Sequence, residues 1–247
     1  MSTPKDLKFY DSLKLRKTRA ESGLFLAEGW RVVEDGLRSG CPCEAVFVRE
    51  GFFGRHEETD ALLSVANTVI LGDKDFMKLS DTEAPQGLIG VFQSGGLLGH
   101  EPESGCLPAL FDVADPRNLG GIVRSADWFG FTELLLGESC VDPFNGKAVR
   151  SSMGAVFRTR FIICEYLEER LAALKSRYRL VVADLDGRDY REFSRDPDSI
   201  FVFSNEARGP SEAILALADD IATIPGSGRG ESLSVAVAAA VMMASLA

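Results

Sequence analysis

The chain has 247 residues, which exceeds the roughly 100–200 of a typical single domain, so one large domain or two modest ones are possible and two are favoured. Its 45% hydrophobic and 26% charged residues are ordinary for a globular protein and exclude a disordered chain, a collagen-like repeat and a coiled coil. The net charge of −10 gives no support to a polyanionic partner, and five cysteines, an odd number, favour reduced thiols over a disulfide framework.

Two features of the sequence bear on membranes and metals. Residues 1–17 carry charge and no apolar stretch, so we expect no secretory signal and a cytoplasmic protein. The longest apolar run, Val235–Ala244, has ten residues, about half of the ~20 that cross a bilayer, and predicts a buried helix rather than a membrane span. The only two histidines, His56 and His100, do not combine with the cysteines at a zinc-type spacing, so we expect no metal.

Basic residues are concentrated at the start of the chain. Residues 1–19 hold six basic residues against Asp6 and Asp11, a net charge of +4, whereas the remainder holds 21 basic and 35 acidic residues, a net −14. A solvated first helix with scattered Lys and Arg would explain this pattern as well as a nucleic-acid contact does. The sequence therefore indicates a basic arm on an acidic body, with both interpretations open.

The first half of the chain mixes helices with short strands. Residues 6–37 are expected to be helical with an interruption near Ser22. Further expected elements are strands at 45–49, 68–71 and 87–93 and a helix at 57–66. Gly, Ser, Pro and acidic residues then dominate 94–105. We therefore predict an N-terminal domain over residues 1–96 and a linker over residues 97–106.

From residue 107 to residue 247 apolar runs alternate with helical stretches. The expected strands are 107–113, 133–136, 161–164, 180–183, 200–203 and 221–224, and the expected helices begin near 120, 167 and 231. Such alternation requires crossover connections, which produce a mainly parallel sheet with helices on both faces. The predicted fold class is α/β, with a C-terminal domain over residues 107–247.

Three polar, glycine-containing segments follow apolar runs of this second half: Asp112–Ala126, Phe203–Ser211 and Ile224–Val235. Ligands of open parallel sheets gather at the carboxyl ends of the strands. Asn118 is predicted to cap the next helix and to favour an anion there, with Arg124 near its first turns, although a surface ion pair would explain Arg124 as well. Walker, Rossmann and serine-hydrolase patterns are missing from the sequence, so we expect a site that works without histidine or metal.

In this order the three segments resemble the motifs of the SPOUT superfamily, in particular its SpoU/TrmH branch of RNA 2′-O-ribose methyltransferases. The first motif is Asp115–Arg124, the second Ser204–Gly209 and the third Ile224–Ala236, and residues 142–155 resemble the segment between the first two. The resemblance covers about residues 107–247. It implies a SPOUT-type parallel sheet with a C-terminal trefoil knot, preceded by a small α/β substrate-binding domain.

The resemblance also implies S-adenosylmethionine as the methyl donor and a homodimer as the active assembly. Main-chain groups of the second and third motifs would hold the donor. The cofactor-binding residues so implied are Phe203, Ser204, Asn205, Glu206, Gly209, Ile224, Pro225, Gly226, Ser232 and Leu233.

Among the side chains, the resemblance implies catalytic roles for Arg124, Asn118, Glu206 and Ser232. Ser234 occupies the position where the family usually has asparagine, so its effect on the rate is open. A guanidinium stays protonated in almost any protein setting. Our hypothesis is therefore that Arg124 clamps the phosphate beside the target ribose and stabilises the developing alkoxide, while another group accepts the proton.

RNA would be contacted by basic side chains outside the donor site. The candidates are Arg16, Lys17, Arg19, Arg117 and Arg150. Trp30, Phe52 and Phe53 are conceivable stacking residues, with core packing favoured for Trp30. Structured RNA is the expected substrate, and the additional N-terminal domain favours ribosomal RNA over transfer RNA. A transfer-RNA enzyme, a base methyltransferase and a catalytically weakened RNA-binding member of the family are the alternatives.

Overall fold

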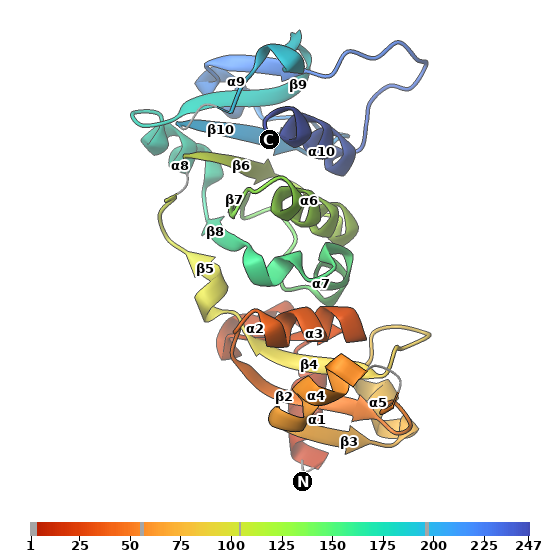
Figure 1. The fold of residues 1–247 in the computed structure, drawn as a ribbon. Helices are drawn as coiled ribbons and strands as arrows, with labels where there is room; N and C mark the ends of the chain where they lie inside the picture. Colours follow the sequence, from red (N-terminus) through yellow and green to blue (C-terminus); the bar gives the residue numbers. More distant parts are fainter. Residues whose placement is uncertain (1–3, 55–56, 104, 196–197) are drawn as a thin grey trace. The chain divides into compact units, whose positions relative to one another are not determined.

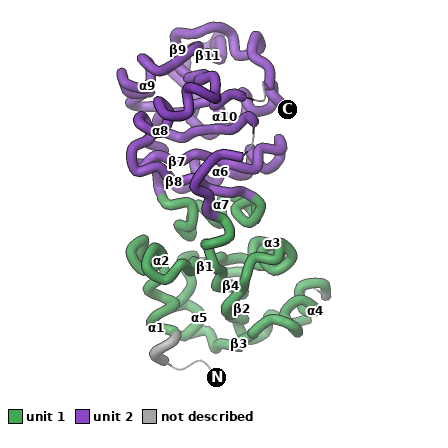
Figure 2. Tube along the Cα trace, turned by 90° about the vertical axis from the view of Figure 1, so that its left-hand side faces the viewer, with its two compact units in different colours: residues 1–97, 142–158 green, residues 98–141, 159–247 purple. Residues whose placement is uncertain are grey.

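The computed structural model describes residues 4–54, 57–103, 105–195 and 198–247 (Figure 1). The chain forms two compact units (Figure 2). Unit 1 contains the residues up to Leu97 together with Asp142–Arg158, and unit 2 contains Leu98–Val141 together with Thr159–Ala247. Among the described residues, no helix combines the length and the apolar character that a membrane span requires. His56 and Ser104, which belong to sequence patterns discussed above, lie outside the described residues.

Unit 1 is a small α/β body built on one four-stranded sheet. Its strands are β1 (Leu24–Glu28), β2 (Cys43–Arg49), β3 (Thr68–Leu71) and β4 (Leu88–Gln93). Its helices are α1 (Pro4–Ser12), α2 (Arg16–Ser22), α3 (Trp30–Arg38), α4 (Glu57–Val65), α5 (Asp73–Leu79) and α7 (Gly146–Ser152), with short 3₁₀ turns η1 (Gly95–Leu97) and η2 (Ala155–Arg158). The strand order is β1-β4-β2-β3, in which β4 is antiparallel to both neighbours and β3 is parallel to β2.

The segment 142–158 belongs to unit 1 because its aromatic side chains complete the core there. Phe144 packs on Phe25 with ring centroids 4.8 Å apart, and Phe157 lies 4.8 Å from Phe92. All four rings are buried. A Cβ on Gly36 would come within 2.5 Å of Phe92 and 2.6 Å of Phe157, so only glycine permits this approach of α3. Packing therefore divides the chain differently from the predicted boundary at 97–106.

Arg19 is a structural residue of unit 1, and its burial gives no support to the expectation that it contacts RNA. Its side chain is 5% exposed and forms an ion pair with Asp142 (Nε to Oδ2, 2.7 Å). The same guanidinium donates to the main-chain carbonyls of Leu13 and Lys14 at 2.8 and 2.9 Å. With its donors engaged inside the protein, Arg19 ties α2 to the segment that completes the core.

Unit 2 contains the parallel sheet that the alternating pattern predicts. Its strands are β5 (Leu98–Gly99), β6 (Cys106–Phe111), β7 (Glu133–Gly137), β8 (Arg160–Cys164), β9 (Arg179–Asp189), β10 (Ser199–Ser204) and β11 (Asp220–Thr223). They lie in the order β11-β9-β10-β6-β7-β8-β5, and every pair is parallel. The α/β prediction is thereby confirmed. Two residues of the predicted linker form β5.

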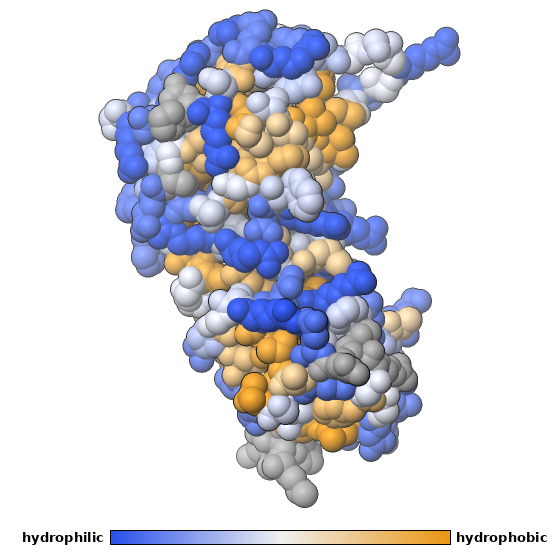
Figure 3. Space-filling view, viewed as in Figure 1, coloured by the Kyte–Doolittle hydropathy of each residue, from blue (hydrophilic) through white to orange (hydrophobic). Residues whose placement is uncertain are grey.

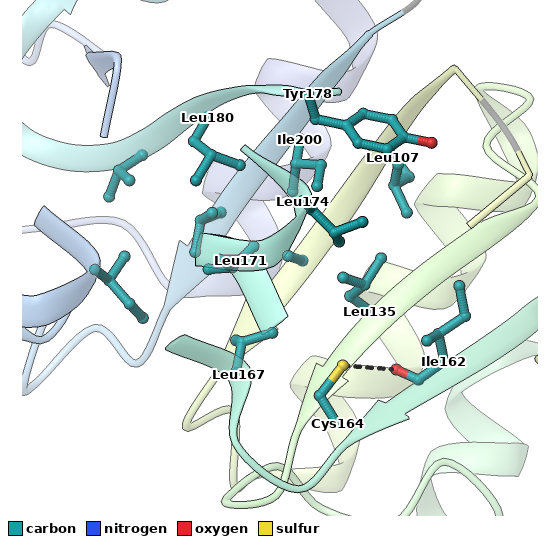
Figure 4. Packing of buried hydrophobic residues seen from close by; sticks show 14 residues of the cluster. Leu107, Leu135, Ile162, Cys164, Leu167, Leu171, Leu174, Tyr178, Leu180 and Ile200 are labelled. Carbon is teal, nitrogen blue, oxygen red and sulfur yellow. Dashed lines mark hydrogen bonds between the residues drawn. The ribbon is translucent and has the colours of Figure 1, made fainter. Parts of the chain in front are cut away.

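Helices cover both faces of this sheet. They are α6 (Pro116–Trp128), α8 (Leu167–Leu174), α9 (Glu212–Leu217) and α10 (Val235–Ser245), with a 3₁₀ turn η3 (Tyr190–Glu192). On one face, Leu167, Leu171 and Leu174 of α8 pack among strand residues such as Leu135 and Ile200 (Figure 4). On the other face, α10 packs against both α6 and β10. The apolar run predicted to be a buried helix is α10, and Val235, Ala239, Met242 and Met243 are its buried residues.

Replacing Arg19 tests its structural role. Removing one partner of a buried ion pair leaves the other charge uncompensated, which typically costs about 3–5 kcal/mol. We expect Arg19→Met to lower the free energy of unfolding by roughly 3 kcal/mol in urea titrations. Lys17→Met is the matched control, because Lys17 is 84% exposed and should change stability by less than about 0.5 kcal/mol. Equal stability of the two variants would contradict this assignment.

Candidate active site

The first two motifs meet at the carboxyl edge of the parallel sheet. β6 and β10 are neighbouring strands, with Phe111 paired with Ser204 at their ends. The hydrogen bonding continues past the strands, because Asn205 donates its main-chain N–H to the carbonyl of Phe111 at 3.1 Å and its side-chain amide to the carbonyl of Asp112 at 3.2 Å. The connections after β6 and β10 lead to opposite faces of the sheet, which is where parallel sheets open a ligand crevice.

One side-chain contact joins the two motifs directly. Asn118 donates its amide to Glu206 Oε1 at 3.3 Å, across 88 positions of sequence. Asn118 does not cap α6, however. Asp115 is the N-cap residue, and its carboxylate accepts the main-chain N–H of Arg117 at 2.7 Å. The helix begins three residues earlier than predicted because Pro116 suits the first helical position. Asn118 therefore lies in the first turn, where its amide reaches Glu206.

Arg124 lies further along α6 than the sequence suggested. It is the ninth of the 13 residues of that helix, exposed to solvent, and forms no ion pair with any other residue that the structure describes. The alternative explanation of Arg124 as half of a surface ion pair therefore finds no support in these residues. An exposed guanidinium without a carboxylate partner keeps its five donors available for an anionic ligand.

Two residues at this edge lie in the predicted segments but are not among the predicted site residues. Asp112 and Arg208 form an ion pair of 2.9 Å, in which Asp112 is largely buried and Arg208 is 77% exposed. Asp112 has φ 56°, a left-handed conformation that is uncommon outside glycine. The only sequence signal for this ion pair is an acidic residue after β6 and a basic residue within the second motif. The pair adds an ionic link to the hydrogen bonds between the segments that follow β6 and β10.

The end of the third motif packs against the first motif, since a Cβ added at Gly121 would lie 3.5 Å from the Cβ of Ala236 on α10, but the residues before it do not. Pro225, Gly226, Ser232 and Leu233 are exposed, and residues 224–233 form no hydrogen bond with α6 or with residues 203–209 within the described parts of the chain. Figure 1 draws this connection between β11 and α10 as an extended excursion. The structure therefore brings Asn118, Asn205 and Glu206 together, but it does not bring Ser232 to Arg124 or Asn118.

Ser234, the departure from the family pattern, has a clear local role. Its hydroxyl accepts the main-chain N–H of Val237 at 3.4 Å and caps α10. Serine and asparagine are both favoured N-caps, so the exchange preserves the start of the helix. The hydroxyl lacks the paired donor and acceptor of an amide, which is the remaining chemical difference.

The other residues predicted to bind the methyl donor differ in solvent exposure. Phe203 is fully buried, so only its main-chain groups are available at the end of β10, while Ser204 and Gly209 are partly exposed. Gly209 has φ +69°, and its main-chain N–H donates to the carbonyl of Asn205 at 2.8 Å, which closes the second motif into a turn. Ile224 is half-buried at the start of the third motif.

Neither a nucleophilic thiol nor a metal cluster is apparent near this edge. Cys140 donates to the carbonyl of Leu110 at 3.2 Å, and burial raises the pKa of its thiol to about 11. A thiol with that pKa is protonated at neutral pH and is therefore a poor nucleophile. Within the described ranges, no three His, Cys, Asp or Glu side chains gather closely enough to hold a metal ion.

Known proteins of the same architecture match nearly the whole chain. The 23S rRNA (guanosine(2553)-2′-O)-methyltransferase RlmP of Bacillus subtilis is 29% identical over 245 residues, covering 96% of this chain and 94% of its own. A TrmH-family structure from Porphyromonas gingivalis superposes with a TM-score of 0.84 at 31% identity, covering 99% and 98% of the two chains. The AdoMet-bound rRNA methyltransferase of Sinorhizobium meliloti gives 0.82 at 26%, covering 99% and 95%.

Two family profiles match successive parts of the chain. Residues 5–90 match the MRM3-like substrate binding domain, which agrees with a separate substrate-binding body at the N-terminus. Residues 108–244 match the SpoU rRNA Methylase family, and this range includes all three motifs. The resemblance drawn from the motifs is confirmed, and the chain belongs to the SpoU rRNA methylase family.

Proposed function

We propose that this protein transfers a methyl group from S-adenosylmethionine to a ribose 2′-OH in ribosomal RNA. The observation that carries the proposal is the joining of the first two motifs at the carboxyl edge of the sheet through Asn118 and Glu206, with the exposed Arg124 on the same helix as Asn118. The names of the relatives support it, since RlmP is a 23S rRNA 2′-O-methyltransferase and the Sinorhizobium meliloti structure holds AdoMet.

The residues present fit the methyl donor. A Cβ added at Gly226, Gly228 or Gly230 would meet no described atom within 4 Å, so a ligand can approach the main chain of the third motif closely. Leu233 offers an apolar side chain, 45% exposed, that an adenine ring can cover. When bound, S-adenosylmethionine supplies a methyl group on a positively charged sulfur.

Arg124 is the residue we assign to the acceptor. A guanidinium cannot serve as the base, because it stays protonated. Its planar donors instead suit bidentate binding of the phosphate next to the target ribose, and its charge stabilises the oxygen as the hydroxyl proton leaves. Glu206 and Asn118 hold the first two motifs in register, and Ser232 joins them in our proposal when residues 224–233 close over the donor.

The homodimer implied by the family finds support on α10. The side chains of Val237, Ala240, Val241 and Ala244 follow helical spacing and are partly or fully exposed. Val237 alone is 47% exposed, and Trp128 at the end of α6 is 83% exposed. Figure 3 shows an apolar area over α10. Apolar surface gathered in this way is typical of an interaction site, and we propose that a second copy covers it.

RNA contact is assigned to the cations that the structure leaves exposed. Arg16, Lys17 and Arg117 are exposed, whereas Arg150 is 23% exposed and lies 3.3 Å from both Glu28 and Asp81. We therefore assign Arg16, Lys17 and Arg117 to the phosphate backbone and give Arg150 a mainly structural role. The free state of all five cysteines supports a reducing compartment such as the cytoplasm.

Arg124→Ala tests the catalytic assignment. Removing a transition-state stabilising donor typically costs about 100- to 1,000-fold in kcat, and we expect a loss of that size with donor binding retained. Methyl transfer is measured with radiolabelled S-adenosylmethionine and ribosomal RNA from a strain that lacks the protein. Arg191→Ala is the control, since Arg191 is an exposed arginine of unit 2 outside the three motifs. Near-normal turnover of Arg124→Ala would show that another group acts on the acceptor.

Primer extension identifies the substrate class. A 2′-O-methyl group stops reverse transcription at low nucleotide concentration, so a strain lacking the protein should lose one stop in its ribosomal RNA. Transfer RNA from the same strain should be unchanged, and resistance of the site to alkaline cleavage separates ribose from base methylation. A lost modification in transfer RNA alone would replace the ribosomal assignment by the transfer-RNA alternative.

Ser234→Asn tests the alternative of a catalytically weakened member. Both residues cap helices, so we expect the free energy of unfolding to change by less than about 0.5 kcal/mol. We expect kcat to change by less than about ten-fold, which corresponds to 1.4 kcal/mol in the barrier. An increase of a hundred-fold or more in the variant would show that serine had largely inactivated the site.

A further inference from the structure

Unit 1 contains a pocket that no part of the methyl-transfer site uses. It has a volume of about 360 Å³, within the ~300–1,000 Å³ common for ligand sites. Its lining includes Glu28, Gly29, Trp30, Arg31, Gln86 and Arg150. These residues come from the end of β1, the start of α3, the loop before β4 and α7, all of which belong to the same compact unit.

Trp30 and Arg31 form an aromatic and cationic side of the pocket. The guanidinium of Arg31 lies 5.0 Å from the centroid of the Trp30 ring. Trp30 is half-buried, so the core packing expected from the sequence accounts for only part of its side chain. The exposed part borders the pocket. Arg31 is exposed and has no ion pair with another residue that the structure describes. Its charge is therefore available to an anion.

The carboxylate of Glu28, in contrast, is satisfied within the protein. It is 6% exposed and accepts hydrogen bonds from the hydroxyls of Ser80 at 2.5 Å and Thr82 at 2.7 Å. Arg150 lies 3.3 Å from the same carboxylate and 3.3 Å from Asp81, so this cluster of one guanidinium and two carboxylates is paired internally and carries a net charge of −1. The other polar and aromatic groups that line the pocket are the Arg31 guanidinium, the Trp30 ring and the exposed amide of Gln86.

We propose that this pocket binds one unpaired nucleotide of the RNA substrate. The base stacks on Trp30, its adjoining phosphate lies against Arg31, and the Gln86 amide reads a base edge. RNA-binding proteins recognise splayed, single-stranded bases in this way, by stacking on aromatic rings and by hydrogen bonds to exposed edges. The inference rests on the proposed function, because it assumes that RNA is the substrate.

The two tryptophans of the chain make the pocket directly observable. Trp128→Phe leaves Trp30 as the only tryptophan, and Trp30→Phe leaves only Trp128, which lies on α6 in unit 2. The probe is a single-stranded eight-nucleotide RNA of mixed sequence, with a blunt RNA duplex for comparison. We expect saturable quenching of Trp30 emission by the single strand, little quenching by the duplex and no saturable quenching of Trp128. Equal quenching by both probes, or none by the single strand, would overturn the proposal.

Affinity variants provide the second test on the full-length protein. Stacking of one base is worth about 1–3 kcal/mol, so Trp30→Leu should weaken binding of the single strand by about 5- to 150-fold. Arg31→Ala should also weaken binding of the single strand, and because Arg31 is exposed the change should not disturb the core. Arg38→Ala, at the far end of the same helix, is the control. Unfolding curves establish that each variant is folded.

The outcomes separate this proposal from the proposed function. If Trp30→Leu and Arg31→Ala, both folded, bind the single strand as well as the natural protein does, the pocket assignment is wrong even if methyl transfer to ribosomal RNA is intact. If both variants lose binding while the natural protein methylates no RNA, the pocket assignment stands and the methyl-transfer proposal is wrong.

Discussion

The parallel pairing of β10 with β6 is the constraint on which the candidate site depends. These strands are separated by about 90 residues of chain, yet their register sets Ser204 beside Phe111 and lets Asn205 continue the hydrogen bonding beyond the strand ends. Only this register places Glu206 within 3.3 Å of Asn118. A shift by one residue would turn alternate side chains to the opposite face and separate the two motifs.

Much of the fold follows from local pattern, and the exceptions have physical causes. Strands of the parallel sheet are buried on both faces and therefore appear as continuous apolar runs, which is why β6 and β10 were predictable. β1 was read as part of a helix, since Leu24–Glu28 gives no periodicity of its own and only its pairing with β4 stabilises the extended form. The burial of Arg19 depends on Asp142, a partner 123 positions away that no local pattern reveals.

The candidate site was predictable to a different degree in each motif. The residues after β6 and β10 were located by the rule that ligands gather at carboxyl ends of parallel strands, and the structure brings them together. The helix cap was misassigned by three positions, because proline after Asp115 starts the helix earlier than the apolar pattern indicates. Ser232 and Leu233 lie in a connection with few contacts, so their association with Arg124, and with it the trefoil knot, stays a prediction.

Calorimetric titration of the full-length protein with S-adenosylmethionine tests the central claim most directly, namely that the joined motifs at the sheet edge form a donor site. The account predicts saturable binding with one site per chain, and a clear loss of affinity when Glu206→Ala removes the hydrogen bond between the first two motifs. Trp30→Leu, in the other unit, should bind the donor as the natural protein does. Absence of saturable binding, or unchanged affinity in Glu206→Ala, would contradict the account.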